Sequence, residues 1–330
     1  MDQLQDSLGR RIRYLRVSVV DACNLGCVYC MPSSRVLFTK FSNLMSPSEI
    51  GTIVEAAAEV GTRTVRITGG EPLVRHDIAE VAGCISDVGL IDDIPISTNG
   101  IFLREKAESL SSAGVTRANV SIDSLQPGVF REVTRGGDIG RVLEGIKAAA
   151  RSGIWPIRIN TVLMNGINDG ELVEIARYAL DHDYSIRFIE MMPLKSNVAF
   201  QPKLFFPAAR AKKLLEEHFH LSAVSHASET GPAVNYGVEG YQGHVGFITP
   251  LSGNFCSRCN RVRVTSDGRL RMCLFGDNMV DLVGIIRAGG GRDEVAAKLR
   301  EMIQFKPEKH YLEIGKTSSE TLFAMSQVGG

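Results

Sequence analysis

Short apolar runs rich in Val and Ile alternate with amphipathic stretches through the first two thirds of the chain. The amphipathic stretches have helical spacing, as Ile50, Ile53, Val54 and Ala57 illustrate. The apolar runs have the length and composition of buried strands, and they span residues 14–19, 64–68, 94–97, 117–122, 157–163 and 185–189. Such a succession of strand–helix units predicts an α/β fold with a parallel sheet, either doubly wound or curled into a barrel.

Polar segments follow most of the predicted strands, at the point where each strand ends. A cysteine-rich loop follows the first strand, and segments 69–72, 98–100, 123–124 and 190–193 follow later ones. Ligand sites of parallel α/β folds lie at the carboxyl ends of the strands. We therefore expect the functional site at this edge of the sheet.

The strand–helix rhythm ends near residue 195. Beyond it, the pattern predicts a helix near 208–218, strands at 234–238 and 244–248, and a hairpin around the turn signal at 266–268. We therefore divide the chain into a barrel domain, residues 1–195, and a C-terminal extension, residues 196–330.

Charge and hydropathy exclude several classes of protein. The chain has 37 Lys and Arg residues against 37 Asp and Glu residues, so no overall basic field attracts nucleic acid. No apolar run is long enough to span a bilayer, and residues 1–13 lack the apolar segment of a signal peptide. The sequence predicts a cytoplasmic protein without nucleic-acid or membrane partners.

Six of the seven cysteines form two groups. We call Cys23, Cys27 and Cys30 the first trio, and Cys256, Cys259 and Cys273 the second trio. The odd total and the length of the chain argue against a secreted disulfide framework, so the groups indicate metal binding. Cys84 lies outside both groups and is expected to be a small buried apolar residue.

Three thiolates on one loop favour a [4Fe-4S] cluster with one iron left open for a small molecule. The alternative for the first trio is structural zinc completed by a distant ligand. For the second trio it is a zinc ribbon with His244 as fourth ligand. If either alternative holds for the whole chain, the protein is a zinc-binding interaction protein and not an enzyme.

The spacing of the first trio resembles the signature of the radical S-adenosylmethionine (SAM) superfamily, as does the Gly69–Gly70–Glu71–Pro72 segment. The resemblance implies that the open iron binds the amino and carboxylate groups of SAM. Reductive cleavage of SAM then yields methionine and a 5′-deoxyadenosyl radical. The implied SAM contacts are Tyr29, Gly70, Ser121 and Met192.

Arginines accompany the second trio. Arg261 and Arg263 share strand parity with Cys259, whereas Arg269 and Arg271 share it with Cys273. Because guanidinium groups match phosphate oxygens, two to four of them beside a metal cluster predict a polyphosphate ligand. The chain contains no P-loop sequence, so a bound nucleotide would be chemically rebuilt and not merely hydrolysed.

The two trios, the Arg261/Arg263 pair and the terminal Gly329–Gly330 together resemble the GTP 3′,8-cyclase family of molybdenum cofactor biosynthesis. The resemblance implies a partial TIM-type barrel of about six βα units as radical SAM core, with a C-terminal α+β extension that carries a second [4Fe-4S] cluster. It implies a lyase that converts GTP to (8S)-3′,8-cyclo-7,8-dihydroguanosine 5′-triphosphate. The implied GTP contacts are Arg16, Arg66, Ser97, Arg158, Arg261, Val262 and Arg263, with Arg187 close by.

The same resemblance implies further partners. They are an electron donor, a downstream cyclic pyranopterin monophosphate synthase that receives the product, and a second copy of the chain in a homodimer. No side chain is predicted as a catalytic residue beyond the cluster-bound SAM. The competing enzyme hypothesis is a radical SAM enzyme with an auxiliary cluster that modifies a peptide or RNA.

Overall fold

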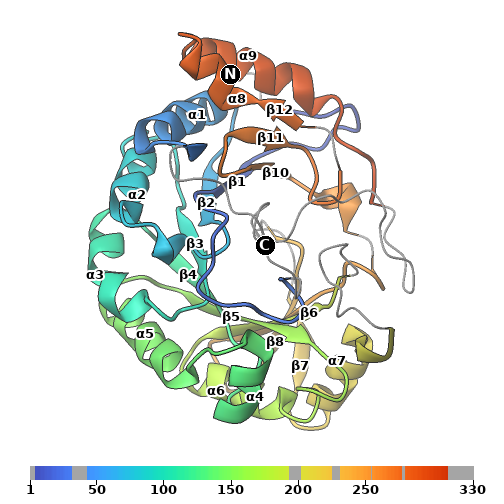
Figure 1. The fold of residues 1–330 in the computed structure, drawn as a ribbon. Helices are drawn as coiled ribbons and strands as arrows, with labels where there is room; N and C mark the ends of the chain where they lie inside the picture. Colours follow the sequence, from blue (N-terminus) through green and yellow to red (C-terminus); the bar gives the residue numbers. More distant parts are fainter. Residues whose placement is uncertain are drawn as a thin grey trace.

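A twelve-stranded sheet organises the computed structural model, which describes residues 4–31, 43–192, 202–224, 231–253, 255–276 and 279–310. The strand order is β12-β11-β10-β1-β2-β3-β4-β5-β6-β9-β8-β7. The sheet curls into an incomplete barrel with helices on its outer side (Figure 1). The predicted α/β partial barrel is confirmed.

The six central strands are parallel and follow one another in chain order. Their positions agree with the apolar runs in the sequence to within two residues at each end. They are β1 (Tyr14–Ser18), β2 (Thr64–Thr68), β3 (Pro95–Thr98), β4 (Arg117–Ser121), β5 (Ile157–Leu163) and β6 (Ser185–Glu190).

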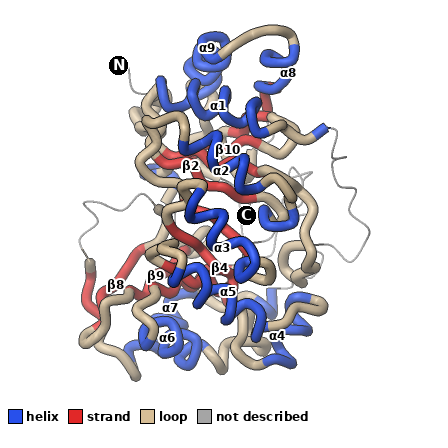
Figure 2. The backbone as a smooth tube through the Cα atoms, turned by 90° about the vertical axis from the view of Figure 1, so that its left-hand side faces the viewer, coloured by secondary structure: helices blue, strands red, loops and turns tan. Residues whose placement is uncertain are grey.

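The connecting helices cover the outer face of the sheet (Figure 2). Ser46 starts the first of them with a capping box, because its Oγ accepts from Glu49 N while the Glu49 side chain accepts from Ser46 N. The helices are α1 (Pro47–Glu59), α2 (Ile78–Ser86), α3 (Leu103–Ser112), α4 (Pro127–Thr134), α5 (Ile139–Arg151) and α6 (Leu172–Asp181). A 3₁₀ turn, η2 (Pro72–Val74), follows β2.

The C-terminal part of the chain extends the sheet at both edges. β9 pairs in parallel with β6, and β10 pairs in parallel with β1. The outer strands then pair antiparallel, including the predicted hairpin of β10 and β11. The strands are β7 (Leu221–Ala223), β8 (Val234–Val238), β9 (His244–Ile248), β10 (Arg261–Val264), β11 (Arg269–Arg271) and β12 (Met279–Asp281).

Helices α7 (Ala208–Glu216), α8 (Leu282–Arg287) and α9 (Arg292–Ile303), with the 3₁₀ turns η3 (Pro202–Leu204) and η4 (Cys256–Arg258), complete the described elements. Helix α9 packs on α1, so the end of the chain's described part returns to its beginning. The sheet itself crosses the predicted domain boundary at residue 195, and that boundary stays a prediction.

The two faces of the barrel differ in chemistry. Side chains on the helix-covered face form the hydrophobic core; Leu15, Val65 and Ile159, for example, are fully buried there. Alternate residues of β5 are only half-buried and face inward, among them Arg158 and Asn160. The barrel interior is therefore polar, unlike a barrel filled by apolar side chains.

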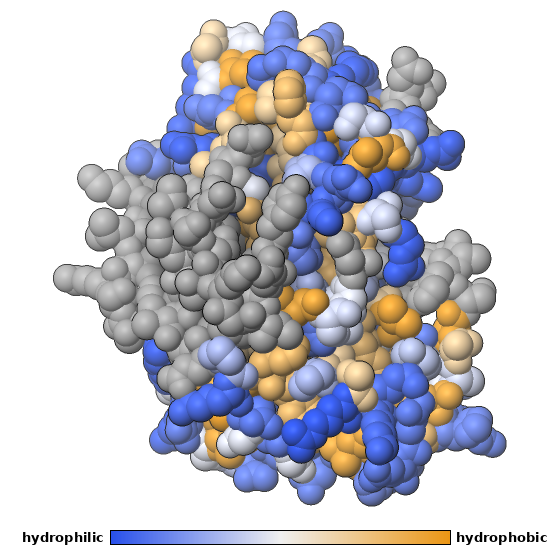
Figure 3. All heavy atoms as spheres, turned by 90° about the vertical axis from the view of Figure 1, so that its right-hand side faces the viewer, coloured by the Kyte–Doolittle hydropathy of each residue, from blue (hydrophilic) through white to orange (hydrophobic). Residues whose placement is uncertain are grey.

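The surface carries no membrane-spanning element that the structure describes. None of the described helices is long and apolar enough to cross a bilayer. Hydrophilic residues cover the upper and lower ends of the face in Figure 3, and apolar residues gather nearer its middle.

Candidate functional site

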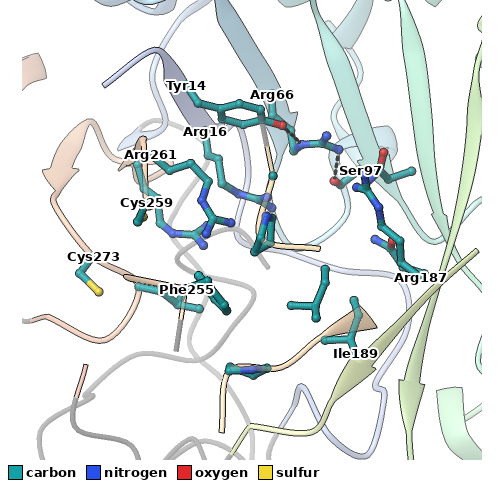
Figure 4. A pocket seen from close by; sticks show the side chains of 18 of the residues that line it. Tyr14, Arg16, Arg66, Ser97, Arg187, Ile189, Phe255, Cys259, Arg261 and Cys273 are labelled. Carbon is teal, nitrogen blue, oxygen red and sulfur yellow. Dashed lines mark hydrogen bonds between the residues drawn. The ribbon is translucent and has the colours of Figure 1, made fainter. Parts of the chain in front are cut away.

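A cavity of about 450 Å³ occupies the inside of the barrel. Its volume lies within the range of small-molecule sites, roughly 300–1,000 Å³. Residues from β1 to β6 line one side, and the segment that carries the second trio lines the other. Figure 4 shows Arg16 and Arg261 reaching into the same space from neighbouring strands.

Strand register explains why arginines gather in this cavity. Arg16 is the register partner of both Arg263 on β10 and Arg66 on β2, so three neighbouring strands present arginines in one row. Asn160 and Arg187 form a similar pair on β5 and β6. Among the described residues that line the cavity are seven arginines and one carboxylate, Asp93; the arginines are Arg16, Arg66, Arg117, Arg158, Arg187, Arg261 and Arg263.

This concentration of positive charge is unfavourable without an anion. Burial lowers the pKa of Arg16 well below its ordinary value, and the charges of Arg263 and Arg66 lower it further. Burial and the Arg261 charge lower the pKa of Arg263 to about 10. A polyanion in the cavity would reverse both effects, because opposite charge favours the protonated guanidinium.

Neighbouring side chains fix some of these arginines in place. Arg66 donates from Nε to the Tyr14 hydroxyl and from Nη1 to Ser97 Oγ at 3.0 Å (Figure 4). Arg117 pairs with Asp93, with 2.6 Å between Nη2 and Oδ2. Held guanidiniums lose less entropy on binding, so the cavity is preorganised for its ligand.

Every predicted GTP contact except Val262 lines the cavity. Val262 is buried in the hydrophobic core behind β10, so a contact between Val262 and GTP would have to involve its backbone. Sequence reasoning missed Tyr14, Asn119 and Asn160, which also line the cavity. The missed residues share strand parity with predicted ones, and that parity is the signal that could have found them.

The second trio lines the same cavity. Burial works to raise the pKa of Cys259, but the charges of Arg261 and Lys306 outweigh it and lower this pKa to about 7. Burial raises the pKa of Cys256. The site therefore stabilises a thiolate at Cys259, the form that binds metal.

Only two of the four arginines of the hairpin reach the cavity. Arg261 and Arg263 line it. Arg271 instead donates to the backbone oxygens of Leu274 at 3.3 Å and Gly276 at 2.6 Å. Arg269 is exposed and pairs with Asp267. Two guanidiniums of the hairpin therefore reach the cavity, the lower limit of the predicted two to four.

The first trio occupies the loop that follows β1 and does not line the cavity. Cys23 Sγ accepts hydrogen bonds from Leu25 N at 3.4 Å and from Asn99 Nδ2 at 3.8 Å. Burial raises the pKa of Cys23 to about 11. Burial, the Asp123 carboxylate and the other two thiols raise the pKa of Cys27 well above its ordinary value.

These shifts test whether the first trio suits an iron–sulfur cluster. Three ionised thiols would repel one another in this loop, so they need positive charge close by. The irons of a [4Fe-4S] core supply that charge, and a thiol that binds metal loses its proton. The first trio therefore fits such a cluster.

The zinc alternative requires a tighter arrangement. Zinc would draw its thiolates to within about 4 Å of one another. Within the described residues, no set of three His, Cys, Asp or Glu side chains is arranged around a single metal ion. The zinc alternative for the second trio stays a prediction.

The predicted SAM contacts lie in different surroundings. Tyr29 packs near Met164 and Met191, and its hydroxyl donates to Asp123 Oδ2 at 2.6 Å. Ser121 ends β4, and Met192 lines the arginine cavity. Of the four predicted SAM contacts, only Met192 lines the same cavity as the predicted GTP contacts. The SAM contacts therefore remain predictions.

Gly70 lies against the chain that leads into the first trio. A Cβ on Gly70 would come within 2.4 Å of the backbone oxygens of Asp21 and Ala22. Gly70 N donates to Val20 O at 2.7 Å, and Glu71 N donates to Ala22 O at 2.9 Å. The glycine is therefore required for the close approach of two loops at the carboxyl ends of β1 and β2.

Glu71 links the same region to the loop after β3. Its carboxylate accepts from Thr98 Oγ1 at 2.7 Å and from Asn99 N at 2.6 Å. Burial raises the pKa of Glu71 to about 7, although these hydrogen bonds oppose the shift. Sequence reasoning assigned Glu71 no separate role. The terminal Gly329–Gly330 lies outside the described residues.

A curled parallel sheet with a three-cysteine loop after its first strand defines the radical SAM class of enzymes. The Radical SAM superfamily model matches residues 17–179, and the Molybdenum Cofactor Synthesis C model matches residues 184–312. The chain also resembles the solved structure of Streptococcus suis SuiB bound to S-adenosylmethionine, with a TM-score of 0.65, 13% identity, and coverage of 88% of this chain and 68% of that one. At this identity the likeness concerns the fold alone.

Curated relatives are closer in sequence. The GTP 3′,8-cyclase of Moorella thermoacetica is 40% identical over 327 residues, which cover 99% of this chain and 100% of that protein. The GTP 3′,8-cyclase of Geobacter sulfurreducens is 40% identical over 330 residues, with coverage of 99% and 100%. The chain belongs to the GTP 3′,8-cyclase family.

Proposed function

We propose that the chain converts GTP to (8S)-3′,8-cyclo-7,8-dihydroguanosine 5′-triphosphate, the first step of molybdenum cofactor biosynthesis. The observation that carries the proposal is the cavity in which seven arginines adjoin the second trio. A nucleoside triphosphate would supply negative charge to these seven arginines, which share a single carboxylate, Asp93, among the described lining residues. The reaction itself is inferred from the GTP 3′,8-cyclase family, to which the chain belongs.

The row formed by Arg263, Arg16 and Arg66 holds the triphosphate. Guanidinium groups bind phosphate oxygens through paired, charge-assisted hydrogen bonds. Arg66 is held by Tyr14 and Ser97, which keep its remaining donors directed at the ligand. These residues bind and orient the substrate and take no part in bond breaking.

The first trio holds the [4Fe-4S] cluster and SAM that characterise the radical SAM class. When bound, this group supplies the 5′-deoxyadenosyl radical, which removes the hydrogen atom from C3′ of GTP. We propose that the second trio holds a further [4Fe-4S] cluster, next to which the purine lies. Arg261 and Arg263, on the strand that follows Cys259, place triphosphate and purine in one cavity.

The overall reaction balances with a one-electron donor used twice. GTP, SAM, two electrons and one proton give the cyclised isomer of GTP, methionine and 5′-deoxyadenosine. The C3′–C8 bond forms, the C3′–H bond breaks, and that hydrogen ends in 5′-deoxyadenosine. A protein electron donor, product transfer to a cyclic pyranopterin monophosphate synthase, and a homodimer belong to the same proposal.

The test is an anaerobic assay of the reconstituted protein with SAM, GTP and dithionite, analysed by mass spectrometry. We expect a product with the mass of GTP and different retention, formed in step with 5′-deoxyadenosine. ATP in place of GTP is the matched control and should give no isomer. SAM cleavage that is indifferent to GTP, with GTP recovered unchanged, would sink the substrate assignment.

A further inference from the structure

Three buried basic side chains hold the backbone around the second trio without lining the cavity. Arg271 is 0% exposed, Lys306 is 5% exposed and Arg10 is 8% exposed. None of them is part of the cavity wall, so they are not available to phosphate there. Each of them donates at least one hydrogen bond to a carbonyl oxygen of a segment that carries a cysteine of the second trio.

Lys306 makes the most direct of these contacts. It follows α9 in the chain, and its ammonium donates to Arg261 O at 2.8 Å and to Met272 O at 2.6 Å. Arg261 comes two residues after Cys259, and Met272 comes directly before Cys273. One ammonium group thus joins the backbone beside two members of the second trio.

The contact stands where the ladder between β10 and β11 stops. The ladder pairs Arg263 with Arg271 and Val264 with Leu270. Continued in the same register, it would place Val262 opposite Met272, but the recorded pairing ends before that pair. Beyond the last pair, the ammonium of Lys306 links the two sides through Arg261 O and Met272 O.

Arg10 has a compensating charge that Lys306 lacks. Arg10 forms an ion pair with Asp6, and it donates to Cys256 O at 2.9 Å. Among the described residues, no carboxylate lies within ion-pair distance of Lys306. A buried charge without a counter-charge is costly, and a cluster held by three thiolates carries net negative charge.

We propose that Lys306 is a positioning residue for the second trio: its ammonium sets the separation of the segments that carry Cys259 and Cys273, next to β10 and β11, and its charge stabilises an iron–sulfur cluster bound between them. The inference rests on the second cluster of the proposed function. Groups that orient metal ligands from behind typically change metal affinity about 10- to 100-fold when removed. Lys306 acts through backbone and charge and touches neither substrate nor SAM.

The test compares full-length protein with the variants Lys306→Met, Lys306→Arg and Lys298→Met. Met keeps an unbranched side chain of similar shape as far as Cε but lacks the ammonium group, whereas Arg keeps a positive charge and hydrogen-bond donors. Lys298 lies on α9, where its ammonium pairs with Glu301, so Lys298→Met is the matched control for losing a lysine near that end of the chain. Each protein is reconstituted anaerobically and measured for iron, for its reduced electron paramagnetic resonance spectrum and for SAM cleavage.

We expect Lys306→Met to fall from about eight irons per chain to about four. Its spectrum should lose the second cluster's signal while SAM cleavage at the first trio continues. Lys306→Arg should recover the second signal, and Lys298→Met should match the unmodified protein. A lysine that only supported packing would lower the melting temperature and leave the spectrum unchanged.

Two results would overturn the inference. One is a Lys306→Met protein with full iron content and an unaltered spectrum. The other is loss of iron from both trios together with SAM cleavage, because Lys306 would then support the whole chain. If the unmodified protein itself binds only about four irons and still cleaves SAM, the proposed second cluster fails, and that outcome is distinct from both.

Discussion

The two cysteine trios differ in how the chain builds them. The first trio lies within eight consecutive residues, from Cys23 to Cys30, on the loop after β1. The second trio is divided between η4, with the residue that follows it, and the segment after β11, and it is supported by Arg10 and Lys306 from the two ends of the described chain. Local sequence is enough to bring the first trio together, whereas the second requires the folded barrel.

The trios also differ in their electrostatic surroundings. Carboxylates lie near the first trio, and the pKa values of Cys23 and Cys27 are raised, in both cases mainly by burial. Cations surround the second trio, and they lower the pKa of Cys259 to about 7. The difference supports the proposed division of labour, in which the first trio serves radical formation and the second trio belongs to a site for an anionic substrate.

Removing a thiol of the first trio should have the largest effect. Cys27→Ser should abolish SAM cleavage, because the cluster loses a ligand, while about four irons remain at the second trio. High-performance liquid chromatography of 5′-deoxyadenosine measures the loss. Cys84→Ser is the control, since Cys84 lies in α2 outside both trios. Equal SAM cleavage in Cys27→Ser and the unmodified protein would refute the assignment of the first trio.

An arginine of the cavity should matter less than a cluster ligand. Arg263→Gln should raise the KM for GTP about 10- to 100-fold, since hydrogen bonds to charged groups contribute about 1.5–3 kcal/mol. Steady-state kinetics under anaerobic conditions give this value. Arg269→Gln is the matched control on the same hairpin, where the side chain is exposed and pairs with Asp267. The prediction fails if both variants change KM equally.

The difference in thiol pKa between Cys259 and Cys23 predicts a smaller effect, a difference in their alkylation rates in the metal-free protein. At pH 8 the Cys259 thiol, with a pKa of about 7, is mostly thiolate, whereas Cys23, with a pKa of about 11, is not. Lower basicity also weakens a thiolate as nucleophile, so the net advantage of Cys259 in alkylation is on the order of tenfold. Peptide mapping after brief iodoacetamide treatment measures both rates. Faster labelling of Cys23 would contradict the electrostatic contrast.

Local patterns predicted the central barrel well. Each of the six parallel strands came from a short apolar run, and the hairpin came from the turn around Gly268, whose φ of +83° favours glycine. The spacing of the first trio and the strand parity of Arg261 and Arg263 could be read from local sequence, whereas the arginines of the parallel strands came from the family resemblance.

Long-range placement could not be predicted. Nothing in the sequence pattern indicated that β9 and β10 would join the sheet beside β6 and β1. Lys306 was missed because it contacts backbone carbonyls, which leave no trace in residue types. Arg271 shares the parity of its neighbours, yet its guanidinium turns to Gly276 O instead of the cavity.

Helix α4 is short and begins at Pro127, without the repeated apolar spacing of the longer helices.

The central claim is that the first trio generates the radical and the second trio presents GTP to it. The most direct measurement follows deuterium from C3′ of labelled GTP into 5′-deoxyadenosine, by mass spectrometry, in the unmodified protein and in Cys273→Ser. We predict that the unmodified protein transfers the deuterium, and that Cys273→Ser still cleaves SAM but yields 5′-deoxyadenosine without deuterium. Equal deuterium transfer in both proteins would contradict the claim.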